Sequence, residues 1–311
     1  MASTARARVT AADAVRRSLE GGRVDIGGLI FQGLLLAALL AAIATLVVLL
    51  TDVAVDGTPV LLERGTDFLT SGTSTRAERA GVGQAIAGSL LLMAIVILLA
   101  LPLGIGAAIY LEEYARDTPV TRLLNTIIRN LAGVPAIVYG LVGLAVFVGA
   151  LGSVTGGRTI ITGGLTLAIL VLPIVIITTA EALRAVPTAI REAAFGVGAT
   201  RWEVVRSHVV PYAAPGILTG TILSLARAFG ETAPLVVVGA IAGTFRFNAD
   251  NVVEQLNGPY TALPTIVYGW ARQPERAFRA DTAAAIIVLL VVLLTVNATA
   301  IVLRNRFERR W

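Results

Sequence analysis

Six long apolar stretches constrain the fold of this chain more than any other feature of its sequence. A helix needs about 20 consecutive apolar residues to cross the hydrocarbon core of a bilayer, and each stretch approaches or exceeds that length. The sequence therefore predicts an all-α integral membrane protein with six transmembrane helices. The predicted spans are Leu29–Leu50, Ile86–Tyr110, Leu131–Leu151, Ile160–Ala180, Ile217–Ile241 and Thr282–Leu303.

The composition supports a membrane location and excludes several classes of site. Hydrophobic residues make up 56% of the 311 residues and charged residues only 14%, whereas a soluble domain carries about 25% charged residues. One core cannot bury such an excess, so lipid must surround much of the surface. The chain has no cysteine and a single histidine, His208, which excludes disulfides, thiol chemistry and a histidine-rich metal centre. We expect no cofactor and no bound metal.

The arginines predict the orientation in the membrane. All the basic residues of the chain are arginine. The two tails and the loops 111–130 and 181–210 carry 16 arginines, whereas the loops 51–85, 152–159 and 242–281 carry 8. Because cytoplasmic loops are enriched in basic residues, we expect both termini to be cytoplasmic. The net charge of +5 then lies mostly at the membrane edge and does not imply nucleic-acid binding.

A short amphipathic helix is predicted before the third span. Thr118 can cap the helix and Pro119 fits its first position. The apolar residues that follow recur at helical spacing, and Arg122 and Arg129 fall on the other face. This pattern is typical of a helix at the inner membrane surface, although a packing elbow between two spans would show the same pattern.

The loop after the fourth span contains two helix signals and a glycine between them. Pro187 ends the span, and Gly198 fits the left-handed position that ends a following helix. Thr200 and Glu203 form a predicted capping box at the start of a second helix. We expect Trp202, Val205 and Val209 to form one apolar face of it. Two short helices with a sharp turn would project into the cytoplasm, where a partner is expected to dock.

The same loop resembles the EAA loop of ABC-importer permeases. The resemblance rests on Glu192-Ala193-Ala194, on Gly198 and on Pro211. His208 stands where isoleucine is usual in that family, which would alter the docking surface slightly. The resemblance implies a type I ABC importer permease fold whose EAA loop couples the membrane helices to a cytoplasmic ATPase. The residues that it places in this coupling loop are Glu192, Ala193, Ala194, Gly198, Thr200, Trp202, Glu203, His208 and Pro211.

Further stretches are similar to the phosphate permeases of that family. The run Ala226–Leu235 is similar to the PstA-type subunit rather than to its PstC-type partner, and Leu263–Trp270 points the same way. The other matching stretches are Tyr110–Ala115, Asn130–Leu141 and Glu181–Pro187. The resemblance implies a permease domain over residues 84–303, preceded by a tail at 1–28 and by the first span with an external loop at 29–83, and followed by a tail at 304–311.

Arg227 and Glu231 are the only charges in the interior of a predicted span. A charge at the bilayer centre costs at least about 2.5–3.5 kcal/mol, so such residues usually face a partner or a polar path. One interpretation is a structural ion pair. The other is that Arg227 attracts the phosphate oxyanion, because a guanidinium meets two oxygens at once, while Glu231 keeps the anion from binding too tightly. Pro234 would kink the helix, and Thr232 would contribute a hydroxyl.

The chain lacks the Gly-x-x-x-x-Gly-Lys-Ser/Thr loop of an ATPase, so we do not expect it to be an enzyme. The resemblance implies a permease subunit that forms half of a phosphate pathway in the cytoplasmic membrane of a prokaryote. Its implied partners are a PstC-type permease, PstB-type ATPase subunits and a PstS-type external phosphate-binding protein. Two alternatives are a permease for another oxyanion, such as molybdate or sulfate, and an ion-coupled secondary transporter.

Overall fold

The structure is a computed structural model that describes residues 26–243 and 251–307. All regular elements within these residues are helices. Most of the predicted N-terminal tail at 1–28, and the last four residues of the predicted C-terminal tail at 304–311, lie outside the described residues. The chain divides into two compact units at Asp52. In the first unit, the apolar part of helix α2 (Ile26–Thr70) is fully exposed, as expected of a helix that lipid or another subunit covers.

Five helices of the described chain are long and apolar enough to cross a membrane. A sixth candidate consists of α4 (Pro119–Ala132) followed by α5 (Ala136–Gly143) and the π-helical η3 (Leu144–Ala150), with a bend of 103° between α4 and α5. The prediction of an all-α membrane protein with up to six spans is confirmed. The single-helix spans are α2, α3 (Gly83–Ile109), α7 (Ile160–Arg184), α10 (Val210–Gly230) and α14 (Ala277–Phe307).

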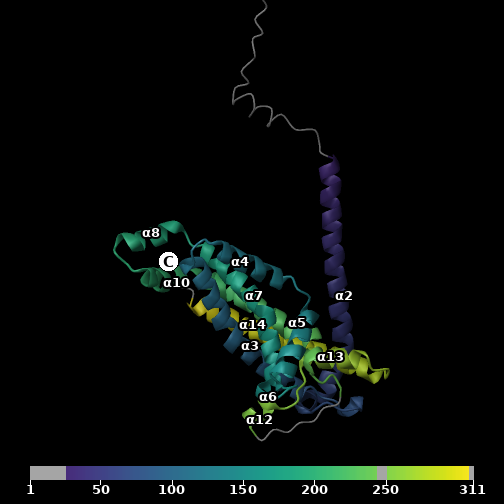
Figure 1. Cartoon of the computed structure of the whole chain (residues 1–311). Coiled ribbons are helices and arrows are strands. Elements are labelled where there is room, and N and C mark those ends of the chain that lie inside the picture. The colour runs from purple at the N-terminus through teal and green to yellow at the C-terminus, as the bar shows by residue number, and fades with distance from the viewer. Residues whose placement is uncertain (1–25, 244–250, 308–311) are drawn as a thin grey trace, which may run out of the picture. The chain divides into compact units, whose positions relative to one another are not determined.

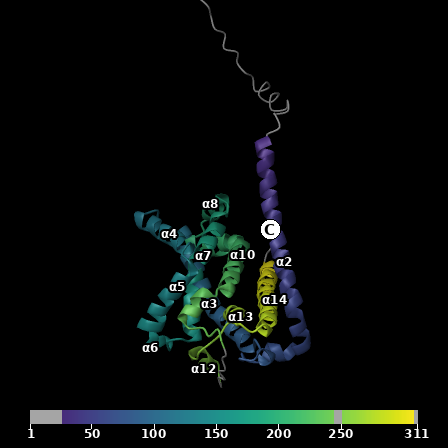
Figure 2. The ribbon, with the colours of Figure 1, turned by 90° about the vertical axis from the view of Figure 1, so that its right-hand side faces the viewer.

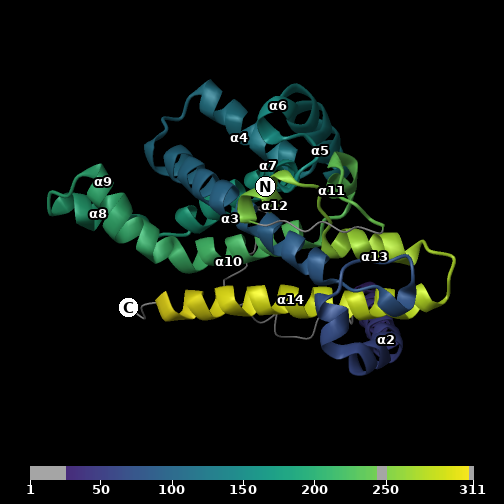
Figure 3. The same cartoon turned by 90° about the horizontal axis from the view of Figure 1, so that it is seen from below.

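Helices α3, α7 and α10 form the centre of the second unit, and α14 packs against α10. They run together as a bundle in Figure 1, with α8 (Thr188–Gly196) at one end and α12 (Val252–Asn257) at the opposite end. Figures 2 and 3 show the same arrangement from two other sides, with α13 (Leu263–Ala271) also at the end away from α8. The bundle therefore separates two groups of short helices, one at each end. The remaining short elements are η1 (Ala77–Arg79), η2 (Tyr110–Tyr114), α6 (Gly152–Thr155), α9 (Arg201–Val204), η4 (Val205–Val209) and α11 (Ala233–Val238).

Two predicted boundaries differ from the structure. The loop predicted at 51–85 is helical up to Thr70, with a kink at Gly65. Gly57 lies directly against the backbone of Ala283 in α14, and Arg64 forms an ion pair with Asp281 of the same helix, so this helical segment packs on α14. The third span begins at Ala136 rather than Leu131, because Pro135 cannot continue α4 and instead starts α5.

The amphipathic helix predicted before the third span is confirmed as α4. The Thr118 hydroxyl accepts a hydrogen bond from the backbone N–H of Thr121 at 3.2 Å, and Pro119 occupies the first turn. No residue of α4 is buried. Its exposed apolar residues are Val120, Leu123, Leu124, Ile127 and Leu131.

Small residues let the central helices approach closely. A Cβ atom added at Gly104 of α3 would lie 2.7 Å from Cγ1 of Val175 in α7, and one at Gly216 of α10 would lie 2.8 Å from Cβ of Ala182. In lipid, apolar side chains gain little from helix association, so close van der Waals packing has to stabilise the bundle. The central glycines therefore fix the distances between the helices.

Two glycines of α3 test this role of close packing. Gly104→Leu should destabilise the subunit by about 1–3 kcal/mol, the usual range for overpacking, and lower its unfolding temperature in detergent. Gly106→Leu is the matched control, since Gly106 lies two residues away with no atom within 4 Å of an added Cβ. Equal unfolding temperatures for the two variants would contradict close packing at Gly104.

Candidate functional site

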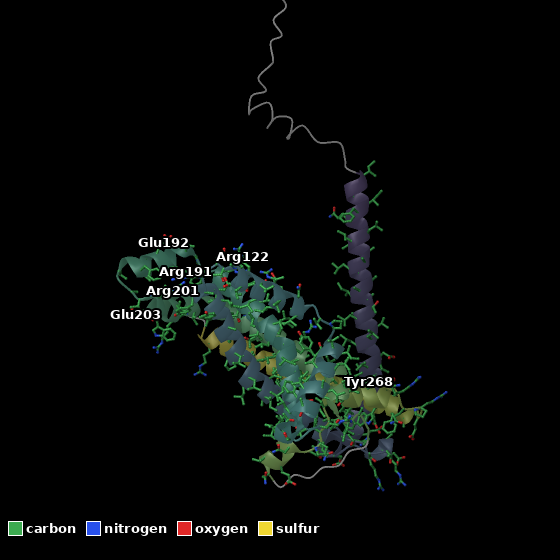
Figure 4. The ribbon with its side chains drawn as sticks, viewed as in Figure 1. Arg122, Arg191, Glu192, Arg201, Glu203 and Tyr268 are labelled. Carbon is green, nitrogen blue, oxygen red and sulfur yellow. The ribbon has the colours of Figure 1, made fainter. Side chains whose placement is uncertain are left out.

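The loop after α7 folds as two short helices joined by a glycine turn. α8 runs from Thr188 to Gly196, with Pro187 at its N-cap, and Gly198 has a φ of +86°. The predicted left-handed conformation of Gly198 is confirmed. Figure 4 shows the labelled residues of this loop, Arg191, Glu192, Arg201 and Glu203, gathered at one end of the molecule.

The predicted capping box at the second helix is also present. The Thr200 hydroxyl accepts a hydrogen bond from the Glu203 backbone N–H at 3.4 Å, and the Thr200 backbone N–H donates to Oε2 of Glu203 at 2.8 Å. Each side chain thus satisfies a backbone amide that the helix cannot. Residues 201–204 form α9, which continues through η4 into α10. The loop is therefore built directly onto α10, one of the candidate membrane spans.

The predicted apolar face of the second helix is only partly correct. Val205 and Val209 are buried, but Trp202 is 60% exposed. Trp202 lies in the first turn of α9, between the exposed residues Arg201 and Glu203. Phe195 and Val197, on the other side of the Gly198 turn, are also exposed. Exposed apolar side chains on a projecting loop are typical of an interaction surface.

The remaining predicted loop residues lie on different sides of the same segment. Glu192 and Ala193 are exposed on α8, whereas Ala194 is buried. His208 lies in η4 and Pro211 in the first turn of α10. Both border an open, mostly apolar pocket of about 250 Å³, together with Ile190, Ser207 and Tyr212.

Two ion pairs that the sequence did not predict join the end of α3 to the end of α7 and to this loop. Glu112 binds Arg184, the last residue of α7, with both carboxylate oxygens, and Oε1 of Glu113 lies 2.7 Å from Nη2 of Arg191 in α8. The sequence signal was the pair of glutamates directly after an apolar span, opposite a loop rich in arginine. Only the folded chain shows which charges meet.

The fifth predicted span is broken rather than kinked. α10 ends at Gly230, Glu231 has an extended backbone, and α11 begins at Ala233. Pro234 lies in the first turn of α11, where its missing N–H is harmless, and this explains why the helix restarts there. The prediction of one continuous helix from Ile217 to Ile241 is therefore wrong.

Arg227 and Glu231 meet across this break. Nε of Arg227 lies 3.3 Å from Oε1 of Glu231, and their side chains are 47% and 19% exposed. Thr232 makes no capping hydrogen bond to α11 with its side chain. The break thus presents a half-exposed guanidinium beside a carboxylate and a hydroxyl. Among the described residues, no group of His, Cys, Asp or Glu could hold a metal ion, and this cluster can instead bind an anion through Arg227.

The chain matches the family model of binding-protein-dependent transport system inner membrane components over residues 100–311. It is 37% identical over 226 residues to the phosphate transport system permease protein PstA of Pasteurella multocida, covering 71% of this chain and 76% of that protein. It is also 32% identical over 271 residues to the phosphate transport system permease protein PstC of Mesorhizobium japonicum, covering 79% and 80%.

Among solved structures, the fold is similar to a chain of a bacterial alginate ABC transporter in complex with an alginate pentasaccharide-bound periplasmic protein. The TM-score is 0.59 at 15% identity, and the match covers 89% of this chain and 96% of that chain. At this identity the likeness concerns the fold alone.

Proposed function

This chain belongs to the family of binding-protein-dependent transport system inner membrane components, and we propose that it is a permease subunit of an ATP-driven phosphate importer. The observation that carries the proposal is its 37% identity to a PstA phosphate permease over three quarters of that protein. The broken span at Arg227 supports it, because broken helices that line a polar path are a common way to build a substrate site in a membrane.

We assign the phosphate pathway to Arg227, Glu231, Thr232 and Pro234. The half-exposed Arg227 guanidinium can donate two hydrogen bonds to a phosphate and does not lose its charge. Glu231 competes with the anion for Arg227, so the anion is released as well as captured. Pro234 restarts the helix and leaves the backbone between Gly230 and Ala233 open to the pathway. One subunit supplies half of this pathway and a PstC-type permease supplies the other half.

The loop from 187 to 211 is the coupling element. Its exposed tip residues Phe195, Val197 and Trp202 offer apolar area to a groove on a PstB-type ATPase subunit, while the capping box and Gly198 fix the shape of the loop. ATP hydrolysis takes place on that partner. A PstS-type external binding protein delivers phosphate from the other side. Both termini and the coupling loop are cytoplasmic, in the cytoplasmic membrane of a prokaryote.

An importer for another oxyanion, such as molybdate or sulfate, would use the same charges, and competition between these anions in uptake separates it from a phosphate importer. A secondary transporter that uses Arg227 and Glu231 as an ion-coupled switch would need neither ATP nor the capped loop. Uptake that continues without ATP would identify it.

The charge pair separates a substrate site from a structural ion pair. The double variant Arg227→Gln with Glu231→Gln removes both charges, so no unpaired buried carboxylate is left. We expect a complex that assembles and hydrolyses ATP but takes up phosphate at least about tenfold more slowly, as the loss of charge-assisted hydrogen bonds predicts. Arg227→Lys is the control that keeps the charge without the planar fork. Wild-type uptake by the double variant would refute the site.

Two glycines at the end of α8 test the coupling loop. Gly198→Val places a β-branched residue at a φ of +86°, which costs about 1–2 kcal/mol in the left-handed region. We expect this variant to reach the membrane but to lose co-purification of the ATPase or phosphate uptake. Gly196→Val is the matched control, because Gly196 is also exposed and open but has a helical backbone. If both variants transport normally, the loop does not couple.

Single cysteines test the orientation, since the chain has none of its own. Arg76→Cys, in the exposed segment between α2 and α3, should react with a membrane-impermeant thiol reagent in intact cells. Ala189→Cys, at an exposed position of α8 in the coupling loop, should react only after the cells are opened. The opposite labelling pattern would place the coupling loop outside.

A further inference from the structure

Three consecutive residues at the end of α3 contact three arginines in and beside the coupling loop. Glu112, Glu113 and Tyr114 belong to the π-helical turn η2, which ends α3. Their partners, in the same order, are Arg184 of α7, Arg191 of α8 and Arg201 of α9. We call these six residues the arginine clamp. The sequence patterns that predict the loop do not require these contacts. The loop lies between α7 and α10, and these contacts join it to α3 as well.

Arg191 is the centre of the arginine clamp. Besides its bond to Glu113, its Nη1 donates to the carbonyl of Val186 at 2.8 Å and its Nη2 to the carbonyl of Leu183 at 2.9 Å. These carbonyls lie at and just after the C-terminal end of α7, where a positive charge also meets the helix dipole. The Glu113 and Arg191 side chains are only 10% and 22% exposed. One guanidinium thus joins α3, α7 and α8 in a largely buried network.

The two other contacts are more accessible. The Arg184 side chain is 47% exposed and binds Glu112 as a bidentate pair, an arrangement that fixes the mutual orientation of both groups. The Arg201 guanidinium carbon lies 5.3 Å from the centre of the Tyr114 ring, within the range of a cation–π interaction. The three contacts fall on both sides of the Gly198 turn. They hold both arms of the coupling loop.

The opposite part of α3 lies beside the broken span. Leu92 and Met93 of α3 line a small cavity together with Ala228, Phe229 and Leu235, which flank Arg227 and the break in sequence. Ser89, one turn away, accepts a hydrogen bond from the backbone N–H of Leu263 at 2.8 Å. Helix α3 therefore contacts the coupling loop through its end and, through its middle, residues that flank the proposed phosphate site.

We propose that the arginine clamp makes α3 a second element, beside α10, that transmits movement of the coupling loop to the phosphate pathway; α10 continues directly from the loop. This inference rests on the proposed function. The residues of the arginine clamp are positioning residues. They contact neither phosphate nor ATP but determine how the loop moves with the membrane helices. When the clamp is intact, a shift of the docked loop must move α3, and with it the packing beside Ala228 and Phe229. Without the clamp, the loop can move while α3 stays in place.

The experiment compares phosphate uptake with ATP hydrolysis in the reconstituted complex of both permeases, ATPase and external binding protein. The test variants are Glu112→Gln with Arg184→Gln and Glu113→Gln with Arg191→Gln, which remove whole ion pairs. The control is Asp117→Asn with Arg122→Gln, a nearby ion pair whose side chains are 81% and 69% exposed. We expect both test variants to retain the ATPase and hydrolyse ATP, and the phosphate carried per ATP to fall by about fivefold or more.

Two further measurements separate coupling from stability. A spin label on Ala189→Cys, at an exposed position of α8 outside the tip, should be more mobile in both test variants than in the wild type and the control. Reversal of the accessible pair, Glu112→Arg with Arg184→Glu, should restore much of the uptake per ATP. If the Glu113–Arg191 variant does not accumulate in the membrane, the Glu112–Arg184 variant alone tests the inference. The Arg184 side chain is already 47% exposed, so its replacement should disturb folding less.

Wild-type uptake per ATP in the test variants would overturn the role of the clamp and leave the proposed function intact. A wild-type chain that never co-purifies with an ATPase would overturn the proposed function and this inference with it. A loss of uptake per ATP in the control variant as large as that in the test variants would also overturn the inference, because the effect would then not belong to the clamp.

Discussion

The absence of hydrogen-bond partners in lipid is the constraint on which the rest of this structure depends. Each backbone N–H and C=O that crosses the bilayer has to be satisfied within its own segment, and in a single helix it is. This explains why all regular elements of the described chain are helices. It also gives special weight to the places where a helix stops inside an apolar stretch. One is the bend between α4 and α5, and the other is the break between Gly230 and Ala233.

The two interruptions share a cause in the sequence and pack against each other in the fold. Pro135 and Pro234 each stand near the start of a short helix, α5 and α11, where a proline fits and a continued helix does not. A Cβ added at Gly140 of α5 would lie 2.7 Å from Cα of Pro234. The short helices thus support each other, which is the condition under which a broken helix is tolerated at membrane depth. The break that carries Arg227 is consequently a fixed feature of the fold.

Much of this fold could be predicted from the sequence, because the strongest signals were local. Apolar length gave the spans, Thr118 and Pro119 gave the start of α4, and the Thr200–Glu203 capping box gave the start of α9. The errors arose where contacts distant in sequence decide. The helix continues to Thr70 and packs on α14, and Trp202 is exposed at the start of α9 rather than buried with Val205. Packing between residues distant in sequence has no short sequence signature.

The candidate site likewise has one part that could be predicted from the sequence and one part that could not. Arg227 and Glu231 could be singled out because a charge in an apolar stretch is costly, and the structure pairs them even though the helix ends between them. The arginine clamp could not be predicted, because charged residues at a membrane boundary are common. Nothing in the sequence indicates that Glu113 pairs with Arg191, which lies 78 positions later. Pairing across such a separation depends on α3 and α7 lying side by side.

The clamp and the charge pair place two kinds of electrostatic interaction at different points along the central helices. The Glu113–Arg191 pair is largely buried, and Arg191 also donates to two backbone carbonyls. Removal of one partner would therefore leave a largely buried charge without a counter-charge. The Arg227–Glu231 pair is half exposed and has one contact of 3.3 Å, so an incoming anion can compete for the guanidinium. The first arrangement suits a joint that must hold while the loop moves, and the second suits a site that must bind and release. Helix α10 connects the loop to Arg227 through the chain itself, and α3 adds a second connection, with the Glu113–Arg191 pair at one point and its contact with Ala228 and Phe229 at another.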